Sequence, residues 1–87
     1  MFTAAGWTRF NGMVIINHDD KVIYVATTED CEKACASETS FSCLTIDYRQ
    51  ADQKCCLSQE TQDTVGAAWQ AGLGWIHSQK ISDPTPG

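Results

Sequence analysis

The hydrophobic positions of this chain fall into short runs that polar segments separate. Residues 7–17 and 21–25 are rich in β-branched and aromatic side chains, which is typical of strands. Residues 44–48, Leu-Thr-Ile-Asp-Tyr, alternate between apolar and polar and predict a strand buried on one face. A return strand begins at residues 55–57, and residues 73–78 form the closing strand. The pattern leaves open whether the first two strands pair with each other.

One short helix is predicted between the second and third of these strands. Thr27 is a candidate N-cap, and with Asp30 it imitates a capping box, although Asp is shorter than the usual Glu. Glu29 and Asp30 lie in the first turn, where the helix dipole favours acids. The apolar positions end near Ser37, so the helix has about ten residues and is marginal alone. Residues 65–72 fit either one turn of helix or an irregular loop.

All five cysteines lie between residues 31 and 56. Cys31 and Cys35 are four positions apart, which places them on one face of the helix, one turn apart. Four cysteines allow three pairings, and spacing alone does not choose among them. Proximity favours a bond from Cys35 to Cys43 across a short connection, with Cys31 bonded to Cys55. Cys43 does not fit the alternation of the strand after it, so it either precedes that strand or a bulge intervenes.

Cys56 is left over from this scheme. On the return strand Cys55 and Leu57 share one face, and Cys56 points to the other. Three interpretations stay open for it. It forms an intermolecular disulfide that gives a covalent homodimer, it packs as a small buried hydrophobe, or it replaces Cys55 in the bond to Cys31.

The segments T-E-D-C-E-K-A-C, F-S-C-L-T-I-D-Y and K-C-C-L-S together resemble the PAN/apple domain family, over roughly residues 5–81. The resemblance implies an α+β fold in which a single short α-helix packs on a curved antiparallel β-sheet and two disulfides staple the two together. It also implies the pairing of Cys31 with Cys55 and of Cys35 with Cys43. No cysteine precedes residue 31 or follows residue 56, so the chain looks like the two-disulfide PAN type.

Two further points follow from the resemblance. Cys56 departs from it, because the family usually has another residue at this position. In the family the last strand returns to pair near the first, which would bring Trp75 close to Trp7 or Phe10.

The chain length of 87 residues indicates one domain. We expect the domain to span residues 7–81, with a flexible lead at residues 1–6 and a linker or tail at residues 82–87. So small a core needs staples, and disulfides form in oxidising compartments. The sequence therefore predicts a secreted or extracellular protein, and it contains no stretch long enough for membrane insertion as a helix.

Charge and motifs argue against several classes of function. The net charge is -5, and the six basic residues are scattered singly, which disfavours nucleic acid and heparin as partners. His18 and His77 are remote from the cysteines, and the common zinc spacings are absent, so neither a metal nor another cofactor is expected. Catalytic motifs such as G-x-S-x-G or H-E-x-x-H do not occur, so an enzyme is not expected.

Candidate ligand-binding residues gather around the central hairpin and in the glycine-rich segment. Asp47, Tyr48, Arg49 and Lys54 combine acid, hydroxyl and cation groups that suit sugar hydroxyls or a protein partner. Trp69, if exposed, suits stacking on a sugar. The resemblance implies a recognition module. We expect lectin-like carbohydrate binding, with a protein-interaction or adhesion module that dimerises through Cys56 as the alternative.

Overall fold

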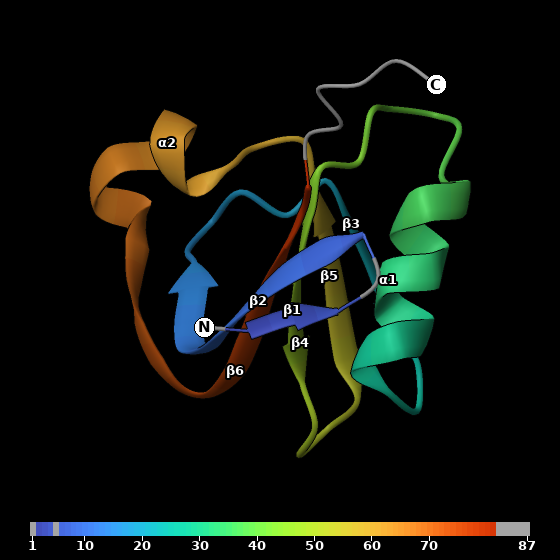
Figure 1. Ribbon diagram of the computed structural model, residues 1–87, viewed down its shortest axis with the longest axis horizontal. Coiled ribbons are helices and arrows are strands. Elements are labelled where there is room, and N and C mark those ends of the chain that lie inside the picture. Colours follow the sequence, from blue (N-terminus) through green and yellow to red (C-terminus); the bar gives the residue numbers. More distant parts are fainter. Residues whose placement is uncertain (1, 5, 82–87) are drawn as a thin grey trace.

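The computed structural model describes residues 2–4 and 6–81, and within them a six-stranded antiparallel sheet carries one ten-residue helix (Figure 1). The strand order is β1-β2-β6-β4-β5-β3. The elements are β1 (Phe2–Ala4), β2 (Trp7–Ile15), β3 (Lys21–Tyr24), α1 (Thr28–Ser37), β4 (Thr45–Arg49), β5 (Lys54–Ser58), α2 (Gln62–Val65), the 3-10 turn η1 (Gly66–Ala68) and β6 (Trp69–Lys80). The predicted α+β class, a helix on an antiparallel sheet with two disulfides, is confirmed.

Helix α1 begins and ends where the local signals place it. The side chain of Thr27 accepts a hydrogen bond from the backbone N–H of Asp30 at 3.1 Å, which satisfies one of the free donors at the helix start. The helix ends at Ser37, and the N–H of Glu38 bonds to the carbonyl of Cys35. The predicted cap and the predicted length are both confirmed.

The core lies between α1 and the two central strands. Ile46 and Tyr48 of β4 and Leu57 of β5 are fully buried there, as the alternation of these strands requires. Disulfides join Cys31 to Cys55 and Cys35 to Cys43 across this layer. The four bonded cysteines belong to the same buried cluster as Ile46 and Leu57. The helix is therefore held to the sheet covalently as well as by packing.

A buried polar cluster adds a third attachment that the sequence pattern does not reveal. Glu32, on the inner face of α1, accepts hydrogen bonds from Nε and Nη2 of Arg9 at 2.8 and 2.7 Å. The hydroxyl of Ser78 on β6 donates to the same carboxylate. Such bidentate, charge-assisted bonds are stronger and more directional than neutral ones. They tie α1 to β2 and β6.

The first two long strands do not pair with each other. β2 pairs with β1 and β6, whereas β3 pairs with β5 at the opposite edge of the sheet. The pairing of β6 with β2 agrees with the closing strand that the resemblance implies. Its detail differs, however, because the partner of Phe10 is His77, and Trp75 lies opposite Arg49 of β4. Trp75 is thus two residues along β6 from the partner of Phe10, and the guanidinium of Arg49 lies over its ring.

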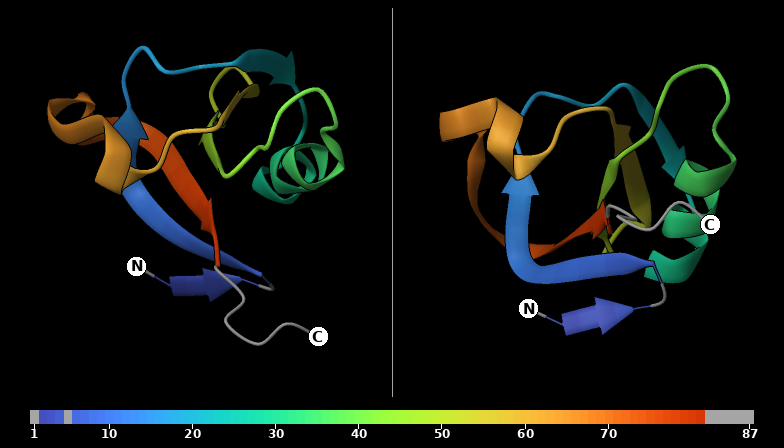
Figure 2. Two further views of the ribbon diagram at one scale, coloured as in Figure 1. Left: turned by 90° about the horizontal axis from the view of Figure 1, so that it is seen from above. Right: turned by 45° about the horizontal axis from the view of Figure 1, so that its top comes forward.

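The β2–β6 ribbon bends along its length. The register shifts between Asn11 and Met13, and Gly12 and Gly74 have φ values of +76° and +88°, which favour glycine. The right-hand view of Figure 2 shows β2 turning sharply, so that its far end leaves the plane of the central strands. As a result β6 is longer than the predicted closing strand, starting at Trp69 instead of Leu73.

The ends of the chain complete the comparison. Residues 1–6, expected to be a flexible lead, contain β1, which pairs with β2. Of the segment 65–72, expected to be one turn of helix or an irregular loop, Gly66–Ala68 forms a 3-10 turn, whereas residues 69–72 belong to strand β6. The expected linker at residues 82–87 lies outside the described residues.

Candidate functional site

The sheet face that points away from α1 carries two rows of side chains across four strands. Residues directly opposite each other on neighbouring strands point to the same side, so the strand register defines the rows. One row is Val22, Cys56, Asp47 and His77, and the other is Tyr24, Lys54, Arg49 and Trp75. We call this surface the open face. Its second row places two cations side by side between two aromatic rings.

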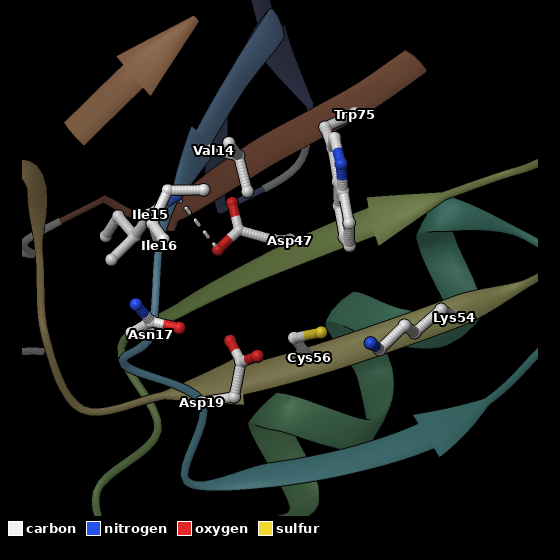
Figure 3. A pocket seen from close by; sticks show the side chains of 9 residues that line it. All are labelled: Val14, Ile15, Ile16, Asn17, Asp19, Asp47, Lys54, Cys56 and Trp75. Atoms are coloured by element: carbon white, nitrogen blue, oxygen red, sulfur yellow. Dashed lines mark hydrogen bonds between the residues drawn. The ribbon is translucent and has the colours of Figure 1, made fainter. Parts of the chain in front are cut away.

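A pocket of about 160 Å³ opens on this face, under the end of the bent ribbon (Figure 3). Val14, Ile15 and Ile16 form an apolar wall at the end of β2. The remaining lining residues are Asn17, Asp19, Asp47, Lys54, Cys56 and Trp75. Asn17 and Asp19 come from the turn after β2, and the others come from the central strands and β6. The pocket thus has an aromatic and aliphatic wall with a few polar groups, which is typical of a small-molecule site.

Asp47 and His77 form the polar floor beneath this pocket. Oδ1 of Asp47 lies 2.8 Å from Nδ1 of His77, and both side chains are buried. Oδ2 of Asp47 accepts a bond from the backbone N–H of Ile15 at 3.4 Å, which ties the bent ribbon to β4. Burial raises the pKa of the Asp47 carboxyl, and the hydrogen bond to His77 opposes that effect. This pair therefore holds the pocket together.

Aromatic rings enclose the other side of His77. Its ring centroid lies 4.6 Å from that of Trp69 and 6.0 Å from that of Phe10. Nε2 of His77 is buried and has no hydrogen-bond partner among the residues that the structure describes. Trp69 is half-buried in this cluster. The cluster supports the floor of the pocket from the side of β2 and β6.

Cys56 sits in the floor as a buried, unbonded thiol. Burial, and secondly the nearby carboxylate of Asp19, raises the pKa of this thiol to about 12. A nucleophilic cysteine needs the opposite environment, and Asp47 stands between Cys56 and His77 in the row. Of the three interpretations of Cys56, the structure agrees with the buried thiol, because Cys55 forms the bond to Cys31. A covalent dimer through Cys56 has no exposed sulfur atom to use.

The structure brings together two of the five predicted ligand-binding residues. Asp47 and Lys54 both line the pocket. Arg49 lies just beside it, with its guanidinium carbon 4.6 Å from the centroid of the Trp75 ring and two hydrogen bonds to Asp52. It thereby holds the indole of Trp75 in place.

The other two predicted residues do not reach the pocket. Tyr48 has no exposed surface, lies on the helix side of β4 and donates its hydroxyl to the carbonyl of Val25 at 2.8 Å. It therefore serves the core. The sequence could have predicted this, because Tyr48 is two positions from Ile46 on the same strand and therefore shares its buried face. Trp69 packs against His77 instead of standing free. Trp75, Asn17 and Asp19 were missed, because only the strand register and the bend of β2 bring them to the pocket.

Neither a metal site nor a membrane-spanning helix is found in the described residues. Within residues 2–4 and 6–81, no group of three or more His, Cys, Asp or Glu side chains is arranged to hold a metal ion. Among the same residues, none of the helices has the length and apolar character needed to span a bilayer. The pocket on the open face is the candidate site that combines an indole with an amide, a carboxylate and an ammonium.

A comparison with protein-family models adds one finding. The model of the PAN domain matches residues 6–80, which include strands β2 to β6, α1 and both disulfides.

Proposed function

Because the chain belongs to the PAN domain family, we propose that it is an extracellular, non-catalytic recognition module that binds carbohydrate in the pocket on the open face. PAN domains are generally interaction modules for protein or carbohydrate, and those with structural disulfides are typically extracellular. What we propose beyond these general family properties is that this chain is secreted and that its ligand is a carbohydrate. The disulfides support the compartment, since such bonds persist under oxidising conditions.

The observation that carries the choice of carbohydrate is the composition of the pocket. Trp75 presents an indole on one wall, and Asn17, Asp19 and Lys54 supply an amide, a carboxylate and an ammonium around it. A sugar ring has apolar C–H faces that pack on aromatic rings and hydroxyls that need hydrogen-bond partners. A pocket of about 160 Å³ is small for a drug-sized ligand and suits one monosaccharide unit of a glycan.

This proposal is tested by NMR titration of the isotope-labelled chain with a panel of methyl glycosides, after a glycan array has chosen the panel. We expect chemical-shift changes at the pocket residues and a Trp75→Ala variant whose affinity falls about tenfold or more. Leu73→Ala is the matched control, because Leu73 is completely exposed and does not line the pocket. If the sugar causes the same chemical-shift changes in the Trp75→Ala variant as in the parent chain, the sugar binds elsewhere.

A protein partner is the second candidate, and the exposed edge of the sheet favours it. Within the described residues, β3 is the last strand in the sheet order and pairs with β5 alone. Its side chains Val22 and Tyr24 are 42% and 66% exposed. An extended peptide that adds a strand at this edge would pair its backbone with β3 and bury both side chains.

Competition separates the two candidates. If an extracellular protein binds at the β3 edge, a Val22→Asp/Tyr24→Asp variant loses that binding and simple sugars do not compete for it. Binding that sugars displace, and that the Trp75→Ala variant loses, supports the carbohydrate instead.

A further inference from the structure

Lys54 adds a specific demand to the pocket that a neutral sugar does not meet. We infer that the preferred ligand is a sugar that carries a carboxylate, such as a hexuronic acid, and that Lys54 binds this carboxylate. The inference rests on the proposed carbohydrate-binding function and goes beyond it by fixing the charge of the ligand and its orientation.

The first support is the state of Lys54. Its side chain is half-buried and lines the pocket, yet among the residues that the structure describes it has no ion-pair or side-chain hydrogen-bond partner. The cation beside it, Arg49, is bonded to Asp52, and Lys21 is bonded to Glu38. An ammonium in a pocket without a protein partner is available to a ligand carboxylate, and such a charge-assisted bond is stronger than a neutral one. Because the chain has a net charge of -5, an anionic ligand is attracted at Lys54 and not to the surface as a whole.

The second support is the polarity of the pocket. Figure 3 shows Lys54 on the same side as Trp75, with its ammonium directed toward Cys56, while Asn17 and Asp19 lie at the opposite end. A hexuronic acid therefore fits in one orientation. Its carboxylate faces Lys54, its ring lies along Trp75, and its hydroxyls bond to the amide of Asn17 and the carboxylate of Asp19.

The acids near the pocket do not cancel this preference. Asp47 lies in the floor, where burial raises the pKa of its carboxyl and His77 is its hydrogen-bond partner. Asp19 is exposed and lies at the end remote from Lys54. Arg49, stacked on Trp75, is paired with Asp52, so Lys54 is the cation that lines the pocket without a partner among the described residues. The single ammonium of Lys54 can bind one carboxylate. A densely sulfated chain needs a cluster of cations, which the described residues of the open face do not provide.

The test is calorimetric or NMR titration with methyl glucuronide and methyl glucoside, and with the corresponding galactose pair, at one pH and ionic strength. We expect the uronide of at least one pair to bind about tenfold more tightly than its neutral counterpart. Lys54→Gln should abolish that preference, so that this variant binds the uronide and its neutral counterpart with equal affinity. Lys33→Gln, on the exposed side of α1, is the matched control and should keep the preference.

The outcomes distinguish this inference from the function on which it rests. Equal binding of uronide and neutral glycoside, unchanged in Lys54→Gln, overturns the inference and leaves carbohydrate binding in place. Absence of binding to every sugar tested overturns both. Near-UV circular dichroism of Lys54→Gln checks that the variant is folded, and raised salt should weaken only the uronide complex if the carboxylate bond is real.

Discussion

Among single residues, Cys56 gives the most direct test of how tightly the open face is closed. Its thiol is buried and has a pKa of about 12, so only about one molecule in ten thousand carries the reactive thiolate at pH 8. We expect the native chain to show no reactive thiol with a chromogenic disulfide reagent. In denaturant one thiol should react, and a Cys56→Ser variant should show none. Rapid reaction of one thiol in the native chain would contradict the burial of Cys56.

Glu32 is the second residue whose role is local and measurable. It is buried and bonds to Arg9 and Ser78, and its removal takes the bidentate carboxylate away from the guanidinium of Arg9. We expect Glu32→Ala to lower the free energy of unfolding by about 2–4 kcal/mol, below the full buried-pair effect because Arg9 is partly exposed. Urea unfolding measures this. The exposed pair offers a contrast, since Lys21→Ala should change stability by less than about 1 kcal/mol.

A double variant identifies the origin of the Glu32 effect. Glu32→Leu/Arg9→Met replaces the ion pair with apolar groups and should recover most of the lost stability. The losses of unfolding free energy in Glu32→Leu and in Arg9→Met are measured separately. If the loss in the double variant equals their sum, the two residues act independently and the paired-charge explanation is wrong.

At the scale of elements, the two disulfides differ in the length of chain that they close. The Cys31–Cys55 bond spans 24 residues and the Cys35–Cys43 bond spans 8. In the chain-entropy model these loops correspond to roughly 3.5 and 2.5 kcal/mol. We expect Cys31→Ala/Cys55→Ala to lower the urea midpoint more than Cys35→Ala/Cys43→Ala does. If the Cys35→Ala/Cys43→Ala variant has the lower urea midpoint, packing around Cys35 in the folded state contributes more than the difference in loop entropy.

The elements that depend on near neighbours could be predicted from the sequence. The cap at Thr27 and the alternation that buries Ile46 act within a few residues. The partner of β3 and the start of β6 could not, because contacts distant along the chain decide them. Residues of the site that depend on such distant contacts could not be predicted either. Asp47 and Lys54 are on the central hairpin, whereas Trp75 reaches the pocket only through the register of β6 with β4.

At the scale of the whole molecule, two groups of acids respond to pH in opposite directions. Burial raises the pKa of Asp47, so the folded chain holds that proton more tightly than the unfolded chain. The corresponding stability is fully present below the ordinary pKa of 3.8 and is lost as the pH rises through the folded value. Glu38 and Asp52 behave in the opposite way, because hydrogen bonds lower their pKa values to about 2. Their stability is present above the ordinary values and is lost as the pH falls.

Asp47→Asn isolates the first of these effects. The variant keeps an oxygen that can accept from His77 or from the N–H of Ile15, but it has no carboxyl to ionise. Because only the parent chain loses stability as Asp47 ionises, the stability of Asp47→Asn relative to the parent should improve between pH 3 and pH 7. Asp52→Asn is the control of opposite sign, since its relative stability should worsen over the same interval. Urea unfolding at several pH values measures both. A relative stability of Asp47→Asn that falls as the pH rises would mean that His77 stabilises an ionised Asp47 more than burial opposes it, and the floor of the pocket would then be an ion pair.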